Sequence, residues 1–157
     1  MSGDTGAGTV RRVVSGGQTG VDRAALDVAR ELGIPCGGWC PRGRRAEDGP
    51  IPDGYPLRET PSGAYPERTA WNVRDSDGTL IVTRGKPRVG TALTVSLARR
   101  AGKPVLVVDL EAGARPSDVR SFLVEDRIRV LNVAGPRESE APGIHDDAFA
   151  FLRNVLS

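Results

Sequence analysis

The residue types best suited to chemistry lie in glycine-rich segments, of which residues 15–20 (SGGQTG) are the most distinctive. Glycines permit a tight turn and a close backbone approach to a ligand, and a following helix offers unpaired N–H groups to an anion. The spacing is not G-x-G-x-x-G, and no Walker A lysine follows, so neither dinucleotide binding nor ATP hydrolysis is indicated. We expect this segment to bind a phosphorylated ligand through Gly16, Gly17, Gln18, Thr19, Gly20 and Asp22. The alternative is a turn that needs glycine only for packing.

Two further segments have a similar character. Residues 85–91 (GKPRVGT) carry two cations before Gly90 and Thr91, and residues 132–139 (NVAGPRES) contain Gly135 and Arg137. An arginine fork just past a strand can pair with an anion through two hydrogen bonds. We expect these four residues to contribute to the same ligand site, although the third segment by itself is more typical of a simple turn.

A short expected helix, residues 64–74, adds a third group of side chains. Arg68, Trp71 and Asn72 are spaced to share one helix face. A cation, an aromatic ring and an amide would suit a flat heterocycle with an anionic tail, so we expect Arg68 and Asn72 to bind ligand. The alternative places Trp71 in the core and Arg68 in a surface ion pair. The preceding residues 41–63 form a long, charged loop. The stretch 39–50 is a candidate lid or wall over the same edge, and the alternative is a solvated loop whose charges neutralise one another.

Periodic apolar residues predict the elements that position these segments. We expect strands at residues 10–15, 36–40, 79–83, 104–110 (the most apolar, and central) and 128–133, and helices at 21–32, 64–74, 91–101, 117–125 and 144–155. Gly33 should end the first helix, and Ser62 and Ser117 should cap two others. Strands separated by helices predict an α/β fold: a single Rossmann-like, doubly wound domain over residues 10–157, with a mostly parallel sheet and helices on both faces. Residues 1–9 are expected to be a disordered tail.

Composition excludes several classes of protein. The 157 residues carry a net charge of only +2, with acids and bases interleaved, so no nucleic-acid partner is expected. No apolar run has the length of a membrane span, and no signal peptide is evident, which predicts a cytoplasmic protein with no membrane partner. Cys36 and Cys40 lack the further ligands of a metal site, and we expect two reduced thiols and no protein-bound metal.

The chain resembles the putative molybdenum-carrier family. The matching segments are SGGQTGVDRAALDVARELG, GGWCPRGRRAEDGPIP, ERTAWNVRDSDGTLIV, VGTALTVSLARRAGKPVLVVDL and LNVAGPRESEAPGI. That family belongs to a Rossmann-like superfamily that includes the lysine-decarboxylase-like proteins, which are phosphoribohydrolases. The resemblance implies a nucleotide-like ligand at the glycine-rich loops, or molybdenum cofactor as cargo, and a homo-oligomer, for which an apolar helix at residues 91–101 also argues.

One position departs from the hydrolase pattern. Those enzymes carry G-G-x-G-T-x-x-E, and here Gly90 and Thr91 are kept while Thr94 stands at the glutamate position. Threonine cannot act as a general base near neutral pH as a carboxylate does. We therefore expect binding or carriage of a phosphorylated heterocycle, with Thr94 lining the site. The alternative is a nucleotide N-glycosidic hydrolase in which Asp22, Asp27, Glu47 or Asp48 supplies the carboxylate, so whether any reaction is catalysed stays open.

Overall fold

The computed structural model describes residues 9–157, so the tail expected at residues 1–9 falls almost wholly outside the described residues. The elements, in chain order, are β1 (Arg12–Val14), α1 (Val21–Leu32), β2 (Cys36–Gly37), β3 (Trp39–Cys40), β4 (Arg45–Ala46), β5 (Gly49–Pro50), β6 (Arg58–Glu59), α2 (Tyr65–Arg74), β7 (Gly78–Thr83), α3 (Val89–Arg100), β8 (Val105–Asp109), the 3-10 turn Leu110–Ala112, α4 (Pro116–Glu125), β9 (Val130–Ala134) and α5 (Ile144–Leu156).

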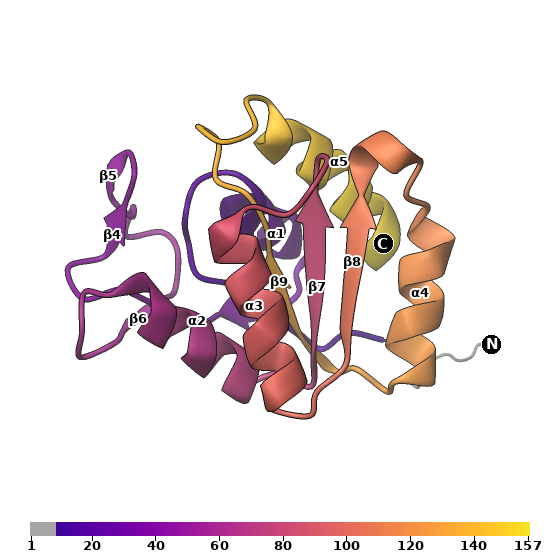
Figure 1. Cartoon of the computed structure of the whole chain (residues 1–157), viewed down its shortest axis with the longest axis horizontal. Coiled ribbons are helices and arrows are strands. Elements are labelled where there is room, and N and C mark those ends of the chain that lie inside the picture. Colours follow the sequence, from indigo (N-terminus) through magenta and orange to yellow (C-terminus); the bar gives the residue numbers. More distant parts are fainter. Residues whose placement is uncertain (1–8) are drawn as a thin grey trace.

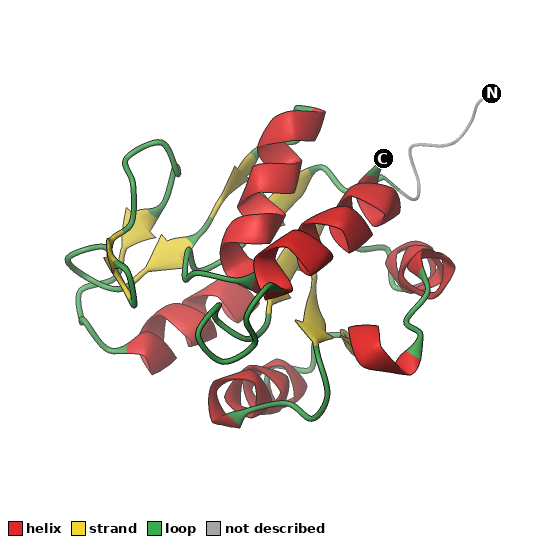
Figure 2. Cartoon of the chain, turned by 90° about the horizontal axis from the view of Figure 1, so that it is seen from above, coloured by secondary structure: helices red, strands yellow, loops and turns green. Residues whose placement is uncertain are grey.

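Five strands form one parallel sheet in the order β2-β1-β9-β7-β8. Helices α1, α4 and α5 cover one face and α2 and α3 cover the other (Figures 1 and 2). The expected α/β fold, a single Rossmann-like domain with helices on both faces, is confirmed. The core lies mainly on the α1 and α5 side, where the buried face of α1 packs against that of α5.

The prediction that the most apolar strand is central was wrong. Residues 104–110 form β8, which lies at the edge of the sheet with Val107 39% exposed. The centre is occupied by β9, whose Asn132 is buried and donates a hydrogen bond from Nδ2 to Thr79 Oγ1 at 3.2 Å. Chain topology sets a strand's place in the sheet, and a satisfied polar pair is tolerated at the centre.

Local boundaries follow residue chemistry with some exceptions. Gly33 ends α1 in the left-handed conformation (φ 73°), as expected. The predicted caps at Ser62 and Ser117 were wrong, because α2 and α4 begin after Ala64 and Arg115 without a side-chain cap and carry proline in the first turn instead. Residues 36–40 split at Gly38 into β2 and β3, and β3 pairs with β6 outside the main sheet.

The strand order has a specific meaning when β9 and α5 are read as the first pair of the chain. The sheet order then becomes 3-2-1-4-5, the order of a doubly wound nucleotide-binding sheet. The connection through α1 runs to one side of β9, and the connection through α3 runs to the other side. Ligands of such sheets bind at the carboxyl edge, where the direction of winding changes.

Candidate functional site

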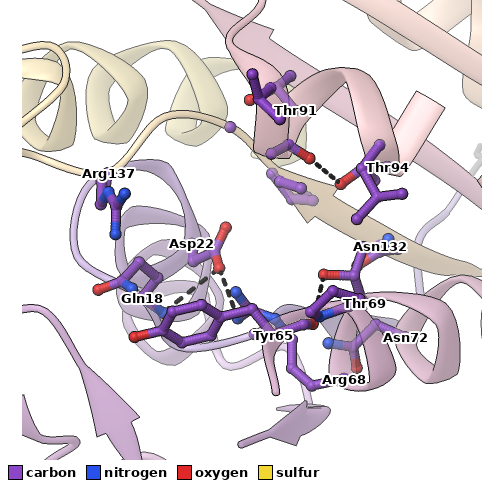
Figure 3. Close-up of a pocket in the computed structure, with 18 of the residues that line it drawn as sticks. Gln18, Asp22, Tyr65, Arg68, Thr69, Asn72, Thr91, Thr94, Asn132 and Arg137 are labelled. Atoms are coloured by element: carbon purple, nitrogen blue, oxygen red, sulfur yellow. Dashed lines mark hydrogen bonds and ion pairs between the residues drawn. The ribbon is translucent and has the colours of Figure 1, made fainter. Parts of the chain in front are cut away.

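A cavity of about 410 Å³ lies at this edge, in the size range of roughly 300–1,000 Å³ of small-molecule sites. Its walls come from the segment after β1, the first turn of α1, the first turns of α2 and α3, and the end of β9 (Figure 3). The lining residues are Gly16, Gln18, Asp22, Tyr65, Pro66, Arg68, Thr69, Asn72, Val89, Gly90, Thr91, Leu93, Thr94, Asn132, Val133, Ala134, Gly135, Arg137 and Glu140.

Most of the expected site residues meet in this cavity. Those that line it are Gly16, Gln18, Asp22, Arg68, Asn72, Gly90, Thr91, Thr94, Gly135 and Arg137. Segments from four parts of the chain therefore converge, and three of them follow strands that share the carboxyl edge of the sheet. That these residues bind a ligand stays a prediction.

Three expected residues of the first segment do not line the cavity. Gly17 (φ 82°) packs against Leu57 and Ile51, where a Cβ would lie 2.4 Å from a Leu57 methyl carbon. Gly20 (φ 81°) lies under the Pro136 carbonyl, 2.3 Å from where its Cβ would be. The Thr19 hydroxyl donates to Glu47 and accepts the N–H of Glu138 at 3.1 Å. These three residues hold the surrounding loops together.

Gly16 differs from these neighbours because the Arg68 side chain covers it. A Cβ at residue 16 would lie 1.9 Å from Arg68 Nη1, so only glycine leaves room for the guanidinium. The Arg68 side chain is 12% exposed, and its Nη1 lies 3.4 Å from Asp22 Oδ2. No residue from 9 to 157 accepts a hydrogen bond from its buried Nε. The arginine is thus held in the wall of the cavity by packing and by one long ion pair.

Asp22 is the buried acid of the site. Burial raises its pKa from 3.8 to about 6, even though Arg68, the Gln18 N–H and Arg23 favour the charged form. The Gln18 N–H donates to Asp22 Oδ2 at 3.4 Å. Asp22 lies in the first turn of α1 and accepts from the N–H of Gln18 just before that helix, so a negative charge already lies at the positive end of α1.

The start of α3 is different, because it is open. No side chain caps this helix, its first turn holds no acid, and nothing lies within 4 Å of the space that a Cβ on Gly90 would fill. Thr91 is 5% exposed, and no described residue accepts from or donates to its hydroxyl. Unpaired N–H groups at a helix start attract anions, so this end of the cavity suits a phosphate.

Thr94 lies one turn further along α3. It is buried at the cavity wall, and its hydroxyl donates to the Gly90 carbonyl at 3.2 Å. Of the four acids considered as replacements for a glutamate here, Asp22 lines the cavity. The others do not line it. Asp27 pairs with Tyr55 and His145, Asp48 pairs with Arg23, and Glu47 accepts from Thr19 and Ser139 and faces Arg137 at the rim. Glu140 lines the cavity as well, and the sequence reasoning missed it.

Arg137 lies at the rim of the cavity. Its side chain is 41% exposed, and its Nε is 3.8 Å from carboxylate oxygens of both Glu47 and Glu140. Burial opposes the ionisation of Glu47, but hydrogen bonds from Ser139 and Thr19 outweigh it and hold the pKa of that carboxyl below its usual value. Arg137 therefore faces two carboxylates loosely, and an anionic ligand would compete with them for the guanidinium.

The aromatic side chain of the site is Tyr65 rather than Trp71. Trp71 does not line the cavity; it packs edge-on against Trp39, with ring centroids 4.7 Å apart. Asn72 borders the cavity, but its amide accepts from and donates to the Trp39 backbone. Tyr65 lies three residues before Arg68, whose guanidinium is 5.4 Å from its ring. That spacing on one helix face was the signal for it.

Among the described residues, no three His, Cys, Asp or Glu side chains cluster as metal ligands would. No described helix has both the length and the apolar composition that crossing a membrane requires.

Cys36 is half-buried and Cys40 is buried, and both are free thiols. The cations of the second segment, Lys86 and Arg88, are exposed and do not line the cavity.

Comparisons with known proteins agree with this geometry. The model of the circularly permutated YpsA SLOG family matches residues 13–156. A crystal structure of a protein described as a putative molybdenum carrier, from Syntrophus aciditrophicus SB, is 43% identical, with a TM-score of 0.92 over 95% of this chain and 96% of that one. No curated protein matches the sequence. The resemblance inferred from the sequence is confirmed. A permutation also accounts for the last strand lying at the centre of the sheet, and the chain belongs to the circularly permutated YpsA SLOG family.

Proposed function

We propose that the cavity binds a small phosphorylated heterocycle and that the protein carries it, with molybdenum cofactor as the first candidate cargo. The observation that carries this proposal is the open start of α3, where Gly90 leaves space and the Thr91 hydroxyl has no partner among the described residues. The name of the 43%-identical relative supports the choice of cargo. A pterin ring is flat and would lie against Tyr65, while its phosphate would take the N–H groups of α3.

Carriage without turnover is supported by residue 94. Thr94 offers a hydroxyl that is engaged within its own helix, where the related hydrolases have a carboxylate. A nucleotide-like ligand would be bound in the same way as the pterin, through its phosphate and its flat ring. We place this activity in the cytoplasm, where the two thiols would stay reduced.

Native mass spectrometry of protein purified gently from its source tests the proposal. We expect a co-purifying compound that contains phosphate and a heterocycle, at up to one per protomer. A Thr91→Val variant, which keeps the β-branched shape but lacks the hydroxyl, should carry less of it. Protein that carries no small molecule, and that binds neither nucleotides nor molybdenum cofactor when they are added, would refute the proposal.

The second candidate function is N-glycosidic hydrolysis of a nucleotide, and one observation favours it. Asp22 is a buried carboxyl whose pKa of about 6 lies in the range of a general acid or base, and it faces the same cavity as the phosphate end. Release of free base from nucleoside monophosphates by the pure protein, abolished by Asp22→Asn, would favour the hydrolase over the carrier.

We also propose that the protein is a homo-oligomer. Val89 at the start of α3 is 89% exposed and Val107 on the edge strand is 39% exposed, and both belong to the α3 and β8 side of the molecule. Closed two-fold dimers are the commonest assembly. Sedimentation at micromolar concentration should give a dimer or a larger species, and a clean monomer would refute this.

A further inference from the structure

Asp22 has an oxygen without a partner. Its Oδ2 accepts from the Gln18 N–H and faces Arg68 Nη1, both at the long distance of 3.4 Å. No described residue donates to Oδ1, and the side chain is only 8% exposed. Figure 3 shows both contacts on one oxygen while the other points away from them. Among the described side chains, the fully buried atom without a partner is Arg68 Nε. Asp22 Oδ1 is not sealed in, and because Asp22 lines the cavity, a donor on a ligand can reach this acceptor.

The cations around Asp22 do not fully stabilise its carboxylate. Arg68 from α2 is the nearest cation, and Arg23 on α1 is turned toward Asp48, with Nη1 2.6 Å from Asp48 Oδ2. Arg137 and Glu140 line the cavity from the segment after β9, and Arg137 faces carboxylates already. Burial outweighs these cations, as the raised pKa of Asp22 shows. A donor from the ligand would stabilise the carboxylate.

The Asp22 carboxylate also determines the orientation of a bound ligand in the cavity. It occupies the amino-terminal end of α1, so a phosphate there would be repelled, and the open end of α3 is left for the anion. Arg68 links Asp22 to Tyr65, because it pairs with one and lies over the ring of the other. The uncharged part of a bound ligand is therefore the part that lies near Asp22.

We propose that Asp22 accepts a hydrogen bond from a neutral N–H or O–H donor of the ligand and selects for ligands that carry this donor together with a phosphate. The inference rests on the proposed function and adds a specificity-determining residue to it. The donor is either a ring N–H or amino group of the heterocycle or a hydroxyl of its sugar.

Calorimetry at pH 7.5 with guanosine 5′-monophosphate, 2′-deoxyguanosine 5′-monophosphate and ribose 5-phosphate tests it. Asp22→Asn, which keeps the shape, should weaken binding of the guanosine nucleotide about 10- to 100-fold, the scale of a hydrogen bond to a charged group. Asp22→Ala serves as a second variant that lacks the acceptor. Asp118→Asn on α4 makes the same change at an exposed acid outside the cavity and should bind as the wild type does.

The probes separate the two sources of the donor. If the ring donates, both guanine nucleotides lose affinity in Asp22→Asn and ribose 5-phosphate does not. If the sugar donates, ribose 5-phosphate also loses affinity. In either case, affinity of the wild type should fall between pH 7.5 and 5 more steeply than that of Asp22→Asn. The variant supplies the baseline, because the phosphate itself titrates near pH 6.

If each probe binds the wild type and both folded Asp22 variants with the same affinity, the role of Asp22 is overturned and the proposed function still stands. Failure of the wild type to bind any of the three, together with no co-purifying ligand, would overturn the proposed function and this inference with it.

Discussion

The guanidinium of Arg68 lies directly over Gly16, in the space that a side chain on residue 16 would fill. A Cβ there would be 1.9 Å from Nη1 and 2.7 Å from Cζ. The glycine after β1 thereby keeps the arginine of α2 in the cavity wall and close to Asp22. The relationship links two segments that are far apart in the sequence, and it makes the glycine a part of the site without any contact of its own to a ligand.

Gly16→Ala should displace Arg68 and weaken binding of a nucleoside monophosphate about tenfold or more, since a 1 Å shift of a positioned group can cost this much or more. The fold should survive, because the clash is with the end of a flexible side chain. Calorimetry measures the affinity, and Gly54→Ala is the control, since a Cβ there meets Arg30 only at 3.5 Å. Unchanged affinity in Gly16→Ala would show that the place of Arg68 is unimportant.

Arg137→Ala should weaken binding of a phosphorylated ligand by about 1.5–3 kcal/mol, the scale of a charge-assisted hydrogen bond. It should cost the fold less than about 1 kcal/mol, because the ion pairs to Glu47 and Glu140 are long and partly exposed. Calorimetry and thermal melting separate the two effects. Arg115→Ala, a change at an exposed arginine just before α4, is the control. A large fall in melting temperature with unchanged affinity would assign Arg137 to the fold.

The unmodified protein should release no free base from nucleoside monophosphates, because Thr94 stands where the hydrolases have a carboxylate. Loss of one catalytic partner typically removes a factor of about 10² to 10⁴ in rate. Chromatography of the reaction mixture detects the base. Thr94→Glu, which places a carboxylate in the cavity wall, should gain weak hydrolysis if the remaining groups are in place. Rapid release by the unmodified protein would contradict the carrier interpretation.

The free energy of unfolding should depend on pH through Asp22. Its folded pKa of about 6 lies above the value of 3.8 for an unfolded aspartate, so between these two pH values the folded state holds a proton that the unfolded state has lost. This contribution is full below about pH 4 and is lost as the pH rises through 6. Asp22→Asn should therefore raise stability at pH 7.5 by up to about 3 kcal/mol, and by less at pH 4.5. Urea unfolding at both pH values measures this, and an equal effect at both would contradict a raised pKa.

The bounds of α1 and the packing of helices on both faces of the sheet were predictable from the sequence, because the spacing of apolar residues that indicates them is local. The apolar spacing of α1 and the left-handed glycine at its end belong to that helix alone. The place of β8 in the sheet was not predictable in this way, because strand order depends on which distant segments pair. Hydropathy reports burial, and β8 is apolar although it lies at the edge.

The site was predictable by segment rather than by residue. Gly16, Gly17 and Gly20 are the same residue type within one turn, yet the first borders the cavity and the others pack against Leu57 and the Pro136 carbonyl. The neighbours that decide this come from elsewhere in the chain, so no local pattern separates the three. Glu140 was missed for the same reason, because its place at the cavity depends on tertiary structure. Tyr65 was missed although its spacing of three residues from Arg68 on one helix face was a local signal.

Amide NMR during titration with guanosine 5′-monophosphate tests most directly whether the cavity binds a phosphorylated ligand. The account predicts saturable shifts of the N–H signals of residues 89–91 at the start of α3, together with that of Gln18. The start of α4 is the internal control, because it also lacks a side-chain cap but does not line the cavity. Shifts at residues 117 and 118 that match those at 89–91, or no saturable shift at either helix, would contradict binding of the phosphate at the start of α3.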